Sequence, residues 1–314
     1  MTAGRFYFIA PMPRLTEAGA WAAQLRRIED LGFHAVAVSE HYSQGWAMDA
    51  LTAMSFALAG TSRLHAMPLV LNNDLHHPAM LAKAVATADV LSAGRAGLGI
   101  GAGWLEDDYR ALGVAYQGAA IRVARLEEAL QVITAFFREE RVTFGGAHYR
   151  VTELESLPRP ARNPRPPVLV GGGGAKMLGL AARYADIVGL HMRLGSGSFD
   201  ESAAAELTAA SVRHKASLVA AAAVEAGRPA PELQFTCYDV NIAGSQVTSG
   251  RRSFADYISA HPDAFAGSPA SLRGSVSECV DDLRRWNEEL GISYWNLGGD
   301  VEALAAVVAR LSGE

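Results

Sequence analysis

Short apolar runs alternate with longer amphipathic segments along the whole chain. Residues 33–39, for example, are mostly apolar and have the length of a buried strand, whereas apolar residues between 15 and 31 recur every three or four positions, as on one face of a helix. We predict strands at 6–10, 33–39, 64–71, 95–100, 168–170, 185–190, 234–242 and 292–297. We predict helices at 15–31, 49–58, 78–91, 121–138, from 176 onward, and at 201–226, 275–291 and 301–311.

Eight strands that each precede a helix favour a parallel (β/α)8 barrel over a doubly wound sheet. A proline-rich stretch at 158–167 resembles a linker, but the same alternation resumes after it, so a single barrel domain over residues 1–314 is expected. Residues 142–151 predict a hairpin around Gly145-Gly146. Segments near 191–200 and 244–266 fit the alternation badly and predict insertions, one of which would cover the site as a lid.

Composition and charge exclude several classes of function. The chain is 50% hydrophobic and 19% charged, with a formal net charge of −5, and it has no basic stripe that would bind nucleic acid or an anionic membrane. The two cysteines provide no disulfide framework and indicate a reducing compartment. No apolar run reaches transmembrane length, and the first residues do not resemble a signal peptide. A cytoplasmic enzyme with a small-molecule substrate is expected.

Two strands run directly into glycine-rich turns, at Gly99–Trp104 and Gly171–Gly174. Neither run matches the dinucleotide fingerprint, because Trp104 and Lys176 stand where its third glycine belongs. On a barrel, both turns would lie at the carboxyl ends of strands, where barrel sites are found. The second turn precedes a helix and therefore predicts a phosphate site, with Lys176 either adding charge or pointing to solvent.

The second strand ends in Glu40-His41-Tyr42 at the same predicted face. His41 can exchange a proton near neutral pH, and the alternative is a histidine that only stabilises the barrel rim. The pair His76-His77 does not predict a metal site, because adjacent extended residues point to opposite sides. Trp46 and Trp104 line an apolar pocket or belong to the core. No serine elbow, zinc signature or Walker loop is present.

Together these segments resemble the bacterial luciferase-like monooxygenase superfamily, particularly its coenzyme F420-dependent branch. The resemblance runs from about Phe6 to about Val308. The segments that carry it are 29–33, 39–41, 69–79, 91–95, 99–104, 170–174, 182–186 and 291–294. It implies a (β/α)8 barrel with a flavin or deazaflavin ring against the carboxyl ends of the strands, and it allows a homodimer.

The resemblance also implies roles for individual residues. His41 would act on the substrate as the catalytic group, and Glu40 would contact the cofactor. A non-prolyl cis bond is expected between Leu69 and Leu71. The other cofactor contacts that it implies are Val70 and Asn72 after the third strand, the backbone of Ala102 and Gly103, and the phosphate-binding residues Gly172, Gly173, Gly174 and Ala175.

One position departs from the sugar-phosphate dehydrogenases of this branch, which carry a catalytic glutamate directly after the fourth-strand glycines. Trp104 stands there, and Glu106 is out of register. The leading hypothesis is an F420-dependent oxidoreductase that transfers hydride between the deazaflavin and an unsaturated or carbonyl substrate. The alternatives are an FMN-dependent monooxygenase that uses a separate flavin reductase as partner, and a non-catalytic barrel that binds a flavin or a protein.

Overall fold

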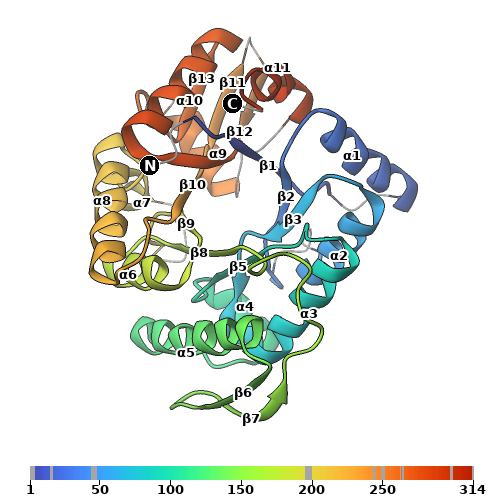
Figure 1. The fold of residues 1–314 in the computed structure, drawn as a ribbon. Helices are drawn as coiled ribbons and strands as arrows, with labels where there is room; N and C mark the ends of the chain where they lie inside the picture. The colour runs from blue at the N-terminus through green and yellow to red at the C-terminus, as the bar shows by residue number, and fades with distance from the viewer. Residues whose placement is uncertain are drawn as a thin grey trace. The chain divides into compact units, whose positions relative to one another are not determined.

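The computed structural model describes residues 4–14, 17–43, 48–194, 200–242, 245–248, 252–261, 263, 265–297 and 300–312. The chain forms two compact units, and each unit is assembled from stretches that are distant in the sequence (Figure 1). The first consists of Met1–Pro13, Ala23–Val36 and Gly171–Glu314, and the second of Arg14–Ala22 and Ala37–Val170. Among the described residues, no helix is both long and apolar enough to cross a membrane.

In the first unit, parallel strands lie side by side in one sheet. Their order is β1 (Tyr7–Pro11), β14 (Ile292–Asn296), β10 (Glu232–Thr236) and β9 (Ile187–Leu190). Phe8, Phe235 and Trp295 are paired in register on adjacent strands and are fully buried, so they form one layer of the core. The helices of this unit are α6 (Ala175–Tyr184), α7 (Glu201–Ala205), α8 (Ala209–Glu225), α9 (Arg252–Ala260), α10 (Val276–Leu290), α11 (Val301–Leu311) and most of α1 (Ala18–Asp30).

The second unit repeats the arrangement of parallel strands and helices. β5 (Leu98–Gly101) pairs with β4 (Leu71–Asn72) and with Val168–Val170 of β8 (Val168–Gly172). β3 (His65–Pro68) precedes β4, and β2 (Ala35–Val38) crosses the boundary between the units. The helices are α2 (Ala50–Gly60), η1 (Asn73–Leu75), α3 (Pro78–Leu91), α4 (Glu106–Leu112) and α5 (Ala119–Arg138), and the hairpin of β6 (Arg141–Gly145) and β7 (Arg150–Glu155) lies beyond α5 in Figure 1.

Eight strand positions were predicted, and the structure has a parallel strand at each of them. The third is divided into β3 and β4 by the cis peptide bond Leu69-Val70, where the family resemblance implied one. The predicted helices 78–91 and 301–311 are found with the same bounds as α3 and α11. Ser275 and Glu278 form the expected capping box, and Gly291 ends α10 in the left-handed conformation.

Two predicted elements are present with the wrong bounds. The strand 234–242 ends at Thr236, because the amides of Tyr238 and Asp239 turn to Ala270 O and β11 (Asp239–Ile242) joins a separate sheet. That sheet also contains β12 (Ser245–Thr248) and β13 (Ser271–Gly274). The helix 201–226 is interrupted, since the Thr208 side chain accepts from Ser211 N and starts α8 anew.

The predicted insertions fall partly outside the described residues. Positions 195–199 of the first segment are not described, nor are 244, 249–251, 262 and 264 of the second. The described part of the second segment contains β12 and α9. Trp46 also lies outside the described residues. The single domain over residues 1–314 stays a prediction.

Candidate active site

Glu40 follows β2 in the second unit and connects it to the end of β4. Its Oε2 accepts a hydrogen bond of 2.7 Å from the amide of Asn72, and its Oε1 lies 2.8 Å from His76 Nε2. The Tyr42 hydroxyl also donates to Oε1, at 3.4 Å. Since the side chain is almost completely buried and both of its oxygens have protein partners, Glu40 holds the strand ends together. Its predicted contact with a cofactor stays a prediction.

His41 is held by a carboxylate that the sequence analysis did not single out. Its Nδ1 lies 2.9 Å from Oδ2 of Asp108, whose side chain is 4% exposed. The other oxygen of Asp108 accepts from the amides of Tyr42 and Ser43, at 3.0 and 2.7 Å, and from the Ser43 hydroxyl at 2.6 Å. Burial alone would raise the pKa of Asp108, but the hydrogen bonds from Ser43 and His41 outweigh it and lower that pKa.

Asp108 reaches this position because α4 begins at Glu106, three residues after the last of the fourth-strand glycines, Gly103. The helix has no side-chain cap at Leu105 and carries three acidic residues, 106–108, in its first turn, where a negative charge is favoured. Only Asp108 is buried among the three. The acidic run was visible in the sequence, but it did not show which carboxylate turns back toward β2.

Trp104 lies edge-on to the imidazole of His41, with 5.8 Å between ring centroids and an interplanar angle of 87°. The preceding Gly103 has a φ of +77°, and a Cβ there would overlap the Tyr109 hydroxyl and the Asn72 side chain. The same hydroxyl lies 3.1 Å from Asn72 Oδ1. Glycine at this position therefore lets the loop after β5 lie directly against Asn72.

The predicted phosphate residues, Gly172–Ala175, form a loop between β8 and α6 in the first unit; we call this the glycine loop. A Cβ on Gly173 would overlap His191 O and lie 2.8 Å from the carbonyl carbon of Met192. Only glycine permits this approach. The first-turn amides of α6 have no acceptor within the helix and lie at its positive end, so the loop suits an anion. Lys176 is exposed.

A buried ion pair between Lys215 and Glu206 holds residues 191–193, the segment that packs on the glycine loop. Lys215 of α8 donates to His191 O at 2.7 Å and to Glu206 Oε2 at 2.9 Å, and Glu206 also accepts from Arg193 Nε at 2.6 Å. Burial would raise the pKa of Glu206, but the bonds from Lys215 and Arg193 lower it, whereas burial lowers the pKa of Lys215 despite Glu206. The sequence signal was a lysine within the apolar stripe of α8, between Val212 and Val219.

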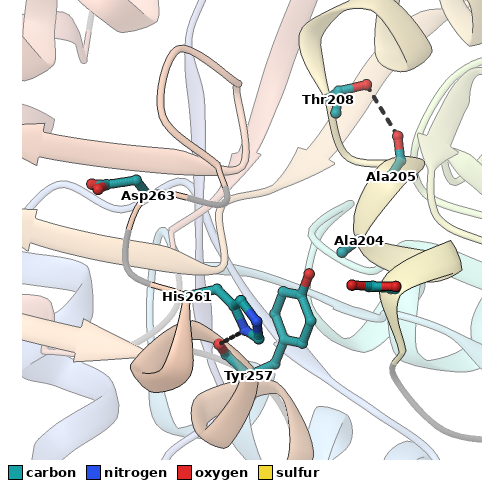
Figure 2. A pocket seen from close by; sticks show the side chains of 7 residues that line it. Ala204, Ala205, Thr208, Tyr257, His261 and Asp263 are labelled. Carbon is teal, nitrogen blue, oxygen red and sulfur yellow. Dashed lines mark hydrogen bonds between the residues drawn. The ribbon is translucent and has the colours of Figure 1, made fainter.

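A separate hollow of about 500 Å³ lies in the first unit, and none of the predicted site residues lines it (Figure 2). The rings of Tyr257 and His261 stack there, with centroids 4.5 Å apart. The remaining lining residues are Glu201, Ala204, Ala205, Thr208 and Asp263. The described residues contain no cluster of three or more His, Cys, Asp or Glu side chains that would hold a metal ion.

Comparison with known proteins gives concordant results. The family model described as luciferase-like monooxygenase matches residues 6–291. The chain is 35% identical, over 164 residues, to an F420-dependent glucose-6-phosphate dehydrogenase of Kineococcus radiotolerans, a match that covers 50% of this chain and 48% of the relative. It is 26% identical over 162 residues to an FMNH2-dependent dimethylsulfone monooxygenase of Pseudomonas putida, with coverages of 50% and 44%. The chain thus spans about half the length of the curated relatives it matches.

The fold is shared over nearly the whole chain with a solved F420-dependent secondary alcohol dehydrogenase in complex with an F420-acetone adduct. The TM-score is 0.76, the identity is 17%, and the match covers 99% of this chain and 100% of that one. The predicted fold class, a luciferase-like (β/α)8 barrel, is confirmed.

Proposed function

The chain belongs to the luciferase-like monooxygenase family, and from this premise we propose that it is an F420-dependent oxidoreductase. Its reaction would transfer hydride between the deazaflavin and an unsaturated or carbonyl substrate. Two similar proteins support this choice, since the Kineococcus relative and the solved alcohol dehydrogenase are both described as F420-dependent.

The observation that carries the proposal is the orientation of His41. An ionised carboxylate can only accept hydrogen bonds, so the proton of neutral His41 lies on Nδ1, toward Asp108. Its Nε2 then has a lone pair and no hydrogen-bond partner among the described residues. A histidine held in this way can take a proton from an alcohol at Nε2, or give one to a carbonyl oxygen when it is protonated.

The described residues fit the cofactor. Gly173 leaves a cradle that a Cβ would fill, at the amino end of α6, and the glycine loop would hold the phosphate. Gly103 leaves a second such cradle beside Asn72, and Val70, Asn72, Ala102 and Gly103 would contact the ring. When bound, F420 supplies two-electron hydride chemistry. The chain's own residues would orient the reactants and move the proton at His41 Nε2.

The surroundings of His41 favour an uncharged, apolar substrate over a sugar phosphate. Its described partners are the Trp104 ring and the Asp108 carboxylate, and neither neutralises a phosphate. Two arginines in the first half of helix α5 are engaged elsewhere: Arg125 pairs with Asp74 at 2.8 Å, and Arg122 stacks on Tyr116 at 4.2 Å. A small ketone, or the corresponding alcohol, meets these conditions.

Equilibrium binding of oxidised F420 and of FMN, measured side by side by fluorescence, tests the cofactor. We expect a clear preference for F420. Gly173→Ala should weaken that binding at least tenfold, because its Cβ displaces the loop. Gly179→Ala, later in α6 with open space around it, should leave binding unchanged.

A preference for FMN, with oxygen consumed during turnover, would instead support the second candidate function. That candidate is an FMN-dependent monooxygenase with a partner reductase, which the Pseudomonas relative favours.

A homodimer is also proposed, through the outer face of α2 and α3. Phe56, Met80 and Leu91 are 68%, 74% and 83% exposed on these two helices, and α2 carries no charged side chain. Sedimentation equilibrium should give twice the mass of one chain. Leu91→Lys should shift the protein toward monomer, whereas Val224→Lys, at an exposed apolar position of α8, should not. A monomeric wild type would refute the proposal.

A further inference from the structure

We propose that Asp108 is the positioning residue of His41, so that the two side chains act as one acid–base pair with a single proton-exchanging nitrogen. This inference rests on the proposed function of His41 and deepens it. It assigns a role to a residue that the family resemblance did not mark.

One oxygen of the Asp108 carboxylate is held by hydrogen bonds, and the other faces the imidazole of His41. Oδ1 accepts three hydrogen bonds from Tyr42 and Ser43, the two residues that follow His41. Those bonds leave Oδ2 facing the imidazole at 2.9 Å. Because the donors come from the same short segment as His41, rotation of the carboxylate would break all of them together. The pair therefore has one arrangement, in which the imidazole plane and its tautomer are both set.

The negative charge of Asp108 is consistent with this geometry. Burial alone would raise the pKa of Asp108, but the hydrogen bonds from Ser43 and His41 lower it, so the carboxylate remains ionised at neutral pH and can only accept from His41 Nδ1. Among the described ionisable groups near this segment, Glu40 is bound to His76, and the pKa of Tyr42 is raised to about 12 by burial and by Glu40 and Asp49. During reduction the carbonyl oxygen takes the Nε2 proton, and His41 returns to the Nδ1–H tautomer that Asp108 holds.

The carboxylate that contacts His41 does not lie directly after the fourth-strand glycines, where the sugar-phosphate dehydrogenases of this branch carry their catalytic acid. The acid expected directly after the fourth-strand glycines is replaced by Trp104, whose ring packs against the imidazole. The buried acid of this chain comes four residues later, and it contacts His41. The carboxylate thus supports the imidazole, and His41 alone serves as the proton donor and acceptor.

Asp108→Asn tests the inference. The amide oxygen would keep the bonds from Tyr42 and Ser43, so the NH2 group would face His41 and donate to Nδ1, which moves the imidazole proton to Nε2. We expect a drop in kcat of about a hundredfold, within the range that a positioned acid or base contributes. Cofactor affinity should not change.

Nitrogen-15 NMR of the imidazoles provides a readout that does not depend on turnover. In the protein without cofactor, neutral His41 should carry its proton on Nδ1 in the wild type and on Nε2 in Asp108→Asn. Asp107→Asn is the matched control: Asp107 lies on the same turn, pairs with Arg110 and is exposed, so the substitution should change neither the tautomer of His41 nor kcat.

An unchanged tautomer in Asp108→Asn would overturn the inference, even if kcat fell through loss of structure. The proposed function would survive that result as long as F420 binds. Conversely, a failure to bind F420 would refute the proposed function, while the tautomer measurement would still decide the role of Asp108.

Discussion

Replacing His41 with glutamine is expected to lower kcat by about 10²–10⁴-fold, the contribution of a positioned acid–base group. Glutamine keeps a polar side chain that can still hydrogen-bond to Asp108, but its amide does not exchange a proton at neutral pH. The affinity for F420 should stay near the wild-type value, because the predicted phosphate residues belong to the glycine loop and not to β2. Steady-state kinetics with fluorescence binding would measure both quantities.

The control for this experiment is His214→Ala, since His214 is an exposed histidine on α8. It should retain full turnover. If His41→Gln also retained full turnover, with folding and cofactor binding intact, the role given to His41 would be wrong. If the wild type showed no redox activity with either cofactor across a broad set of carbonyl and alcohol substrates, a non-catalytic, ligand-binding barrel would become the better interpretation.

The fold could be predicted from the sequence where a periodic pattern of apolar residues coincides with residues that begin or end a helix. Helix α3 begins at Pro78, a residue suited to the first helical turn, and α10 lies between its capping box and Gly291. The predicted strand 234–242 failed because apolar content alone does not show which sheet a residue joins. The amides of Tyr238 and Asp239 bond to Ala270, some thirty residues away, and no local pattern encodes that choice.

The candidate site was predictable only in part. His41 and the glycine loop follow strands directly, so their positions at strand ends were readable from the sequence. Asp108 was not, because residues 106–108 are all acidic and only the packing of α4 decides which one is buried. The partners of Glu40 also depend on tertiary structure, since His76 and Asn72 reach it from the other side of the cis peptide bond at Leu69-Val70.

Removing the ammonium group of Lys215 is expected to have the largest effect on stability. Lys215→Met should lower the free energy of unfolding by about 3 kcal/mol, the lower end of the range for a broken buried ion pair. The lower end applies because Arg193 still pairs with Glu206 in the variant. Chemical denaturation at neutral pH would measure the difference. The matched control is Arg213→Met on the same helix, α8. It breaks an exposed pair with Glu289 of α10 and should cost at most about 1 kcal/mol.

The pH dependence of the same variant gives an independent check. Glu206 has a lowered pKa in the folded protein, so its pairing stabilises the fold above the pKa of the unfolded chain, and this contribution is lost as pH falls through the folded value. Lys215→Met weakens that pairing. The difference in stability between wild type and variant should therefore shrink on acidification, and a difference that stays constant with pH would show that the lost packing of the lysine stem, and not its charge, caused the destabilisation.

Lys215→Met should also affect the proposed phosphate site. Lys215 holds His191 O, and that oxygen lies against Gly173, so loss of the ammonium group frees the backbone on which the glycine loop packs. We expect F420 binding to weaken in Lys215→Met under conditions where the variant is fully folded, and to stay unchanged in Arg213→Met. Unaltered affinity in folded Lys215→Met would mean that the ion pair stabilises the first unit without shaping the loop, and that Gly173 alone determines its geometry.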